Sequence, residues 1–223
     1  MEILYQDKRI LVAVKPTGVL STDEPGGMPE LLRTALHDPQ ACIRTVHRLD
    51  RVVSGVMVFA RSRMAASLLS QQVRERRFTK LYLAVVRGSL AEQCGTLTDL
   101  LLRDPRTRTT CVVDQLGKSV QKAVLDYTVL GEREGLSLIQ IQLQTGRTHQ
   151  IRVQFSSRGL PLVGDRRYGN STEACAIALW SACLTFSHPE SGAPMQFAKQ
   201  PPMDYPWTLF TDALAKTFPD MQK

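Results

Sequence analysis

A single carboxylate between two arginines is the feature of this sequence best suited to chemistry. Asp50 follows Arg48 by two residues and directly precedes Arg51, and Ser54 and Gly55 come just before an apolar run. Positive neighbours keep a carboxylate ionised, so that it can act as a nucleophile or a base. Gly55 also allows a close backbone approach. A structural ion pair would have the same pattern, and the residues alone leave that alternative open.

Basic residues gather in two windows of the chain. There are 28 Lys and Arg against 21 Asp and Glu, which gives a formal net charge of +7. Window 44–80 has nine basic and two acidic residues, so its excess equals that of the whole chain. Window 145–170 adds five arginines and one aspartate. Arginine binds phosphate and stacks on bases, so the pattern favours nucleic acid as a partner. A solvated charged face is the alternative.

The composition is that of a globular protein with a packed core, because 43% of the 223 residues are hydrophobic and 22% are charged. No stretch has the roughly 20 apolar residues that span a bilayer, and the first residues lack the pattern of an export signal. We therefore expect a cytoplasmic protein without membrane association. The five cysteines and four histidines have no metal-ligand spacing, so we expect reduced, mostly structural thiols and no metal.

Short strands dominate the elements that must position these residues. Apolar runs and alternating patterns predict strands at 3–6, 10–14, 56–60, 81–86, 120–130, 136–143 and 176–186. Helices are predicted at 29–36, at 62–73 with Ser62 as N-cap, and at 206–214, whereas 149–155 fits helical spacing poorly. This order predicts an α+β fold with a mainly antiparallel mixed sheet and a few flanking helices, in a single domain over 1–223.

Five short segments occur in a recognisable order. They read K-P-T-G at 15–18, H-R-L-D at 47–50 with S-G at 54–55, K-L-Y at 80–82, T-G-R-T-H-Q-I-R at 145–152 and G-D-R-R-Y-G at 164–169. Together they resemble the motifs of the RluA-type family of RNA pseudouridine synthases. Each segment is weak by itself, but their order and spacing make a chance match improbable. The resemblance covers most of the chain and implies a pseudouridine synthase-like catalytic domain.

The resemblance implies a reaction and its central residues. Asp50 corresponds to the catalytic carboxylate that attacks the target uridine and permits the base to detach, rotate and rejoin through carbon 5. No cofactor is needed for this isomerisation. Arg48 corresponds to the residue that helps to push the target nucleotide out of the stack, where its guanidinium can fill the vacated space.

Further site residues follow from the same resemblance. Tyr82 would cover one face of the flipped uracil and assist proton transfer from carbon 5, and Ile151 would cover the other face. Arg152 corresponds to the basic partner that keeps Asp50 ionised and oriented, and Arg147 is the rival for that role. His47 and Lys15, which belong to matching motifs, are also expected at the substrate.

Three positions depart from the family pattern, namely Val14, Val53 and Gln154. The departures bear on substrate preference more than on activity, and Gln154 is expected to alter a contact to RNA. Only 14 residues precede Lys15, so we expect no N-terminal S4-type RNA-binding domain. RNA binding would then fall to window 44–80 and to Arg158, Arg166 and Arg167. We expect a monomer that acts on structured RNA, with ribosomal RNA favoured over transfer RNA.

Two other functions remain open at this stage. A non-catalytic RNA-binding or ribosome-assembly module would explain the basic windows, and Asp50 would then be dispensable. A glycosidase or nucleoside hydrolase would also use a carboxylate, but such enzymes need a second carboxylate nearby, and the predicted site has one. Release of free uracil would indicate the hydrolase.

Overall fold

The computed structural model describes residues 1–217, which form two compact units. Unit 1 consists of Met1–Lys80 and Trp180–Gln200, and unit 2 of Leu81–Leu179 and the residues from Pro201 onward. The single domain expected over 1–223 stays a prediction. Nearly all strand pairs are antiparallel, which confirms the predicted α+β class with a mainly antiparallel mixed sheet. No helix within residues 1–217 is long and apolar enough to span a membrane.

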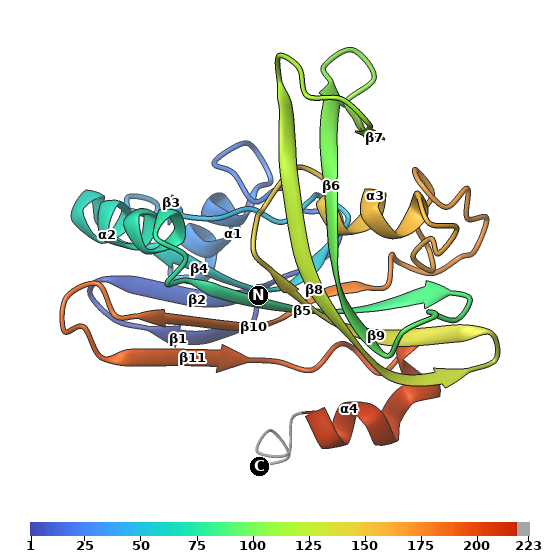
Figure 1. Cartoon of the computed structure of the whole chain (residues 1–223). Coiled ribbons are helices and arrows are strands. Elements are labelled where there is room, and N and C mark those ends of the chain that lie inside the picture. Colours follow the sequence, from blue (N-terminus) through green and yellow to red (C-terminus); the bar gives the residue numbers. More distant parts are fainter. Residues whose placement is uncertain (218–223) are drawn as a thin grey trace. The chain divides into compact units, whose positions relative to one another are not determined.

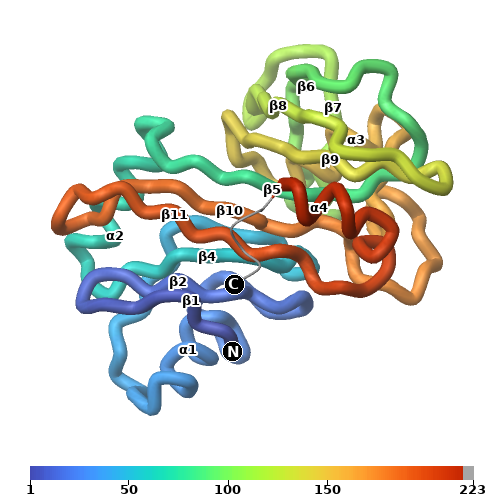
Figure 2. Tube along the Cα trace, turned by 90° about the horizontal axis from the view of Figure 1, so that it is seen from below, coloured from blue at the N-terminus to red at the C-terminus, as the bar shows by residue number. Residues whose placement is uncertain are grey.

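The strands of unit 1 lie in the order β1, β2, β4 and β10 (Figure 2). In addition, β3 pairs with β4, and β11 pairs with β10. Their bounds are β1 Ile3–Gln6, β2 Ile10–Lys15, β3 Arg44–Thr45, β4 Ser54–Ala60, β10 Leu179–Ser187 and β11 Pro194–Ala198. The β4–β10 pair is parallel. β2 and β4 are buried on both faces, which explains why both read as nearly continuous apolar runs.

Two helices accompany this sheet, α1 at Met28–Ala35 and α2 at Arg63–Arg74. Ser62 is the N-cap of α2, as predicted, because its hydroxyl accepts a hydrogen bond from Ala65 N–H (3.1 Å). Ala65 and Leu69 of α2 are buried in a core with residues of β2, β4 and β10. Burial of this helix face against the strands stabilises the scaffold from which the loop with Asp50 extends.

The strands of unit 2 lie in the order β5, β9, β8, β6 and β7, all antiparallel. Their bounds are β5 Thr79–Arg87, β6 Cys94–Asp104, β7 Thr109–Val113, β8 Val120–Arg133 and β9 Leu136–Leu143. The helices are α3 Gln150–Ser156, the 3-10 helix η1 Trp207–Phe210, and α4 Thr211–Thr217. β6 and β8 form a long ribbon with β7 at its upper end (Figure 1).

Helix α3 confirms the weakly indicated helix at 149–155 and explains why its pattern was poor. Every residue from Gln150 to Phe155 is buried, so the helix has no polar face to produce an amphipathic period. Val153 packs with Leu101 of β6 and Ala123 of β8 in the core of this part of unit 2. The helix thereby fixes Ile151 and Arg152 against the sheet.

Candidate active site

Asp50 is half-buried in the loop that leads into β4. The residue before it is fixed by Ser21, whose hydroxyl accepts from Leu49 N–H (3.0 Å) and donates to the Leu49 carbonyl (2.8 Å). The residues after it form a turn in which Val53 N–H donates to the carbonyl of Asp50 (3.0 Å). The backbone on both sides of the carboxylate is therefore held in place.

Lys15 lies beneath this loop and has no exposed surface. Its ammonium donates to the carbonyls of Pro16 (2.9 Å), Arg51 (3.1 Å) and Val53 (2.7 Å). Burial lowers the pKa of Lys15 to about 8, while the negative charge of Asp50 acts in the opposite direction. Lys15 thus holds the backbone just after Asp50 and supplies a positive charge near the carboxylate. This geometry supports a positioning role, and the expected substrate contact of Lys15 stays a prediction.

His47 is also buried, whereas Arg48 is exposed. The Nε2 atom of His47 accepts from Val58 N–H (3.2 Å), and its ring lies 5.4 Å from that of Phe78. Burial, with a smaller effect of the Lys80 charge, lowers the pKa of His47 to about 3. The imidazole is therefore neutral and joins the loop to β4. The expected contact of His47 with substrate stays a prediction. Arg48 differs from His47 because its side chain is exposed to solvent.

Unit 2 positions Tyr82, Ile151 and Arg152. Tyr82 lies on β5 opposite Ile141 of β9, and it is buried. Ile151 and Arg152 are buried in the first turn of α3. A guanidinium that is buried in this way needs several hydrogen bonds to compensate for the water it has lost.

Asp165 supplies those hydrogen bonds to Arg152. Its Oδ2 accepts from Nε (2.8 Å) and its Oδ1 from Nη2 (2.8 Å) of Arg152. Oδ1 also accepts from the N–H groups of Arg167 (3.0 Å) and Tyr168 (3.1 Å). Burial alone would raise the pKa of Asp165, but Arg152 and these N–H groups bring it below its usual value. The bidentate pair fixes the plane and direction of the guanidinium.

Tyr168 connects this pair to the strands. The guanidinium carbon of Arg152 lies 5.0 Å from the centre of the Tyr168 ring. The Tyr168 hydroxyl accepts from Thr110 N–H of β7 (2.9 Å) and lies 2.6 Å from Nδ1 of His149. Sequence reasoning matched Asp165 and Tyr168 to a motif but gave neither a role. Only the folded contacts reveal that they hold Arg152.

Arg147, the rival of Arg152, is attached to a strand. Its Nε donates to the carbonyl of Lys122 on β8 (3.1 Å), and its N–H donates to Oε1 of Gln150 (3.0 Å). The structure thus brings the predicted residues into two groups. Unit 1 holds Lys15, His47, Arg48 and Asp50, and unit 2 holds Tyr82, Arg147, Ile151 and Arg152.

Two residues expected to contact RNA make contacts within the protein. Gln154 is buried, and its Nε2 donates to Oδ2 of Asp99 (2.7 Å). Arg158 pairs with both oxygens of the same aspartate (3.0 Å each). Asp99 therefore neutralises a charge that the sequence window 145–170 counted toward RNA binding.

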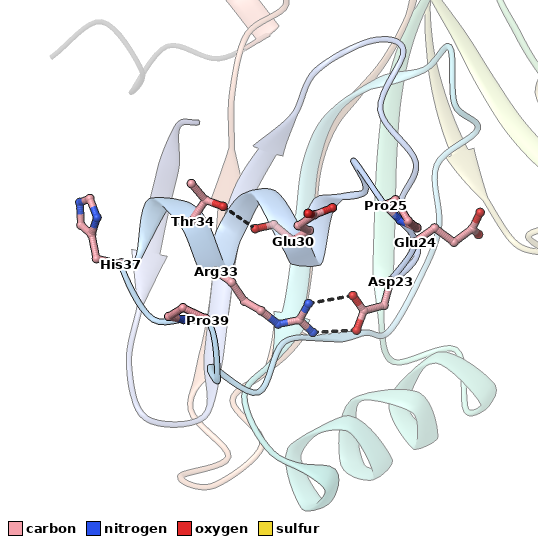
Figure 3. A pocket seen from close by; sticks show the side chains of 8 residues that line it. All are labelled: Asp23, Glu24, Pro25, Glu30, Arg33, Thr34, His37 and Pro39. Carbon is pink, nitrogen blue, oxygen red and sulfur yellow. Dashed lines mark hydrogen bonds and ion pairs between the residues drawn. The ribbon is translucent and has the colours of Figure 1, made fainter.

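An open pocket of about 720 Å³ lies beside α1 and is separate from the predicted site residues (Figure 3). Asp23, Glu24 and Glu30 contribute acidic side chains, and Arg33 is paired with Asp23 (2.7 Å). An acidic lining of this kind repels phosphate. Within residues 1–217 no group of His, Cys, Asp and Glu side chains has an arrangement that could hold a metal ion.

Comparisons with known proteins agree on one family. A family model described as RNA pseudouridylate synthase matches residues 9–157. The dual-specificity RNA pseudouridine synthase RluA of Yersinia pestis is 38% identical over 206 residues, which cover 88% of this chain and 97% of the relative. The ribosomal large subunit pseudouridine synthase D of Xylella fastidiosa is 35% identical over 227 residues, covering 92% and 67%. The solved structure of human RNA pseudouridylate synthase domain containing 1 has a TM-score of 0.76 and 27% identity, covering 92% and 84%.

Proposed function

Because the chain belongs to the RNA pseudouridylate synthase family and is an RNA pseudouridine synthase, we propose that Asp50 is the carboxylate that attacks the target uridine. The supporting observation is the position of Asp50 in a loop held from both sides, by Ser21 at Leu49 and by Lys15 at Arg51 and Val53. A nucleophile that is already oriented loses little entropy when it reacts.

The isomerisation conserves all atoms and needs no cofactor. The bond from the ribose to nitrogen 1 of uracil breaks as the Asp50 carboxylate forms a covalent bond to the target nucleotide. The base turns, carbon 5 bonds to the ribose, and the bond to Asp50 breaks, which returns the free carboxylate. The proton on carbon 5 must then leave, and nitrogen 1 gains a proton. Tyr82 covers one face of the uracil and assists this proton transfer, and Ile151 covers the other face.

Arg152 is the basic partner of Asp50 in this proposal. Two of its three guanidinium nitrogens donate hydrogen bonds to Asp165, which fixes the direction of the group. Arg147 is the weaker candidate for this role, because its Nε already donates a hydrogen bond to the Lys122 carbonyl on β8. Arg48 is exposed and can enter the space that the flipped nucleotide vacates. Lys15 and His47 position the loop from beneath.

Ribosomal RNA is the proposed substrate in preference to transfer RNA. Support comes from the similarity to the Xylella fastidiosa relative, whose name specifies the large ribosomal subunit, while the Yersinia pestis relative is named as having dual specificity. We expect the enzyme to act on structured RNA as a monomer in the cytoplasm. A non-catalytic RNA-binding or ribosome-assembly role would instead make Asp50 dispensable.

The proposal is tested by mapping pseudouridine with carbodiimide chemistry in ribosomal and transfer RNA from cells that lack the gene. The cells are complemented with wild type, with Asp50→Asn, or with Asp23→Asn as a control carboxylate that is paired with Arg33. Wild type and the control should restore a site that Asp50→Asn does not restore. Restoration by Asp50→Asn would contradict the role of Asp50, and free uracil released by the purified enzyme would indicate a hydrolase.

A further inference from the structure

Unit 2 has a group of exposed arginines that joins two residues of window 145–170 to three that lie outside both sequence windows. Arg103, Arg106 and Arg108 lie at the end of β6 and in the turn that leads to β7, and Arg166 and Arg167 lie in the loop after α3. These five residues are called the arginine patch. The three arginines of the turn were overlooked because Asp104 lies among them and no long basic run marks the segment.

Hydrogen bonds fasten the two parts of the arginine patch together. Nη1 of Arg167 donates to the carbonyls of Thr107 (3.3 Å) and Arg108 (3.1 Å). The Tyr168 hydroxyl accepts from Thr110 N–H on β7 (2.9 Å). Figure 1 shows β7 at the upper end of the ribbon, and the loop that carries Arg166 and Arg167 follows α3. The two segments that carry the arginine patch are therefore fixed relative to each other, and Arg167 links them.

The charge of the arginine patch is not neutralised by the protein. Within residues 1–217 none of its five guanidinium groups forms an ion pair with a carboxylate, although arginines elsewhere do. Examples of such pairs are Arg9–Glu190, Arg87–Glu173, Arg133–Asp212, Arg152–Asp165 and Arg158–Asp99.

The nearest acidic residue, Asp104, is occupied by the turn itself. It accepts from Arg106 N–H (2.8 Å) and from the Thr107 hydroxyl (2.9 Å). Like charges gathered on one rigid surface repel one another, and a bound polyanion removes that repulsion.

We propose that the arginine patch binds backbone phosphates of the RNA substrate outside the target nucleotide. The proposal rests on the proposed function, because that function makes structured RNA the polyanion that the protein meets. Exposed guanidinium groups suit phosphate contacts, which position RNA without reading its sequence. The loop with Arg166 and Arg167 also contains Asp165, which accepts two hydrogen bonds from Arg152. Phosphates bound by the patch would therefore contact residues close in sequence to the one that orients Arg152.

The test compares two triple variants that change the net charge equally. Arg106→Ala with Arg108→Ala and Arg166→Ala removes part of the patch but retains Arg167, which fastens it. The control, Arg9→Ala with Arg87→Ala and Arg133→Ala, removes exposed arginines that are paired with carboxylates. Binding of a fluorescein-labelled RNA stem-loop is measured over a range of salt concentrations, and circular dichroism checks that both variants fold.

The patch variant should bind the stem-loop roughly tenfold or more weakly than wild type at moderate salt. Its slope of log K against log salt should fall by about 2, since each lost phosphate contact removes roughly 0.7 to 0.9. The KM for ribosomal RNA should rise while kcat at saturating RNA stays unchanged. The control should resemble wild type in all three quantities.

Two results would overturn the patch as an RNA site, namely unchanged binding or an equal loss in the control, which would reflect net charge alone. The proposed function fails separately. A wild-type enzyme that makes no pseudouridine but binds RNA through the patch would refute the reaction and support the patch. If the wild type is active and the patch variant has unchanged affinity and KM, the reaction is supported and the patch is refuted.

Discussion

His47 Nε2 accepts a hydrogen bond from Val58 N–H inside unit 1, so the fold requires the neutral imidazole. Protonation would convert this acceptor into a donor that faces another donor. Burial also favours the neutral imidazole, because it disfavours the charged ring and lowers the pKa of His47 to about 3. The residue next to the exposed Arg48 is thereby committed to the neutral form at all physiological pH values.

The depressed pKa of His47 makes the stability of the protein sensitive to acid. The unfolded chain gains a proton on this residue as the pH falls through about 6.5, whereas the folded protein does not until about 3. The free energy of unfolding should therefore decrease between these values, by on the order of a few kcal/mol. His47→Gln retains an acceptor for Val58 N–H but has no titrating group.

Urea denaturation of wild type and His47→Gln at pH 7 and pH 4 checks this prediction. The variant should lose less stability between the two pH values than wild type, because the other titrating groups are common to both proteins. Equal losses would show that His47 does not titrate differently in the folded and unfolded states.

At the scale of elements, Gly55 permits the close approach of β4 and β10. Its φ is +125°, and a Cβ added there would lie 2.4 Å from the carbonyl oxygen and 2.5 Å from the nitrogen of Ser181. Both contacts are with backbone atoms of the neighbouring strand, so neither can move without disturbing the parallel pair. Ser181 also donates from its hydroxyl to the Val56 carbonyl (3.0 Å).

Gly55→Ala should lower the free energy of unfolding by about 3 kcal/mol or more, because the strained backbone and the clash act together. Gly192→Ala is the matched control in unit 1, since Gly192 also has a positive φ (+71°) but an added Cβ would meet nothing within 4 Å. The control should lose about 1 kcal/mol. Thermal unfolding followed by circular dichroism measures both, and equal losses would mean that the β4–β10 contact can adjust.

The sequence predicted well those strands in which one face or both faces are buried, because burial requires apolar residues in a regular pattern. β2, β4 and β9 consist largely of buried apolar residues, so their patterns were clear. β6, β7 and β11 were not predicted. β6 alternates between exposed and half-buried residues over most of its length. One face is therefore open and the other is only partly covered, which leaves little apolar contrast.

The candidate site was partly predictable for a different reason. Asp50, Tyr82 and Arg152 were found because they belong to short motifs whose order can be compared with a known family. The supports of these residues involve partners far away in the chain, such as the contact of Lys15 with Val53 and that of Tyr168 with Thr110. No local pattern encodes such contacts, so they appear only in the folded protein.

At the scale of the whole molecule, the formal charge of +7 says little about where anions bind. Several arginines are neutralised by carboxylates within the protein, and Arg152 and Arg158 of window 145–170 are among them. The five arginines of the arginine patch, by contrast, are exposed and have no carboxylate partner within residues 1–217.

The cysteines also differ in accessibility, which corrects the expectation of mostly structural thiols. Cys42, Cys94 and Cys111 are exposed, Cys175 is half-buried, and Cys183 is buried in β10. All five are free. Exposed thiols have no packing role to protect them, so they should react with alkylating reagents while the protein is folded.

Treatment of the native protein with N-ethylmaleimide at neutral pH should therefore modify three cysteines quickly. Cys175 should react more slowly, because burial raises the pKa of its thiol and only the thiolate attacks the reagent. Cys183 should react only after denaturation, since reagent access requires β10 to separate from its neighbours. Intact mass spectrometry counts the additions, peptide mapping locates them, and the guanidinium-unfolded protein is the control with five. Rapid native modification of Cys183 would instead mean that β10 opens readily, and the rigid placement of Gly55 against Ser181 would then need to be reconsidered.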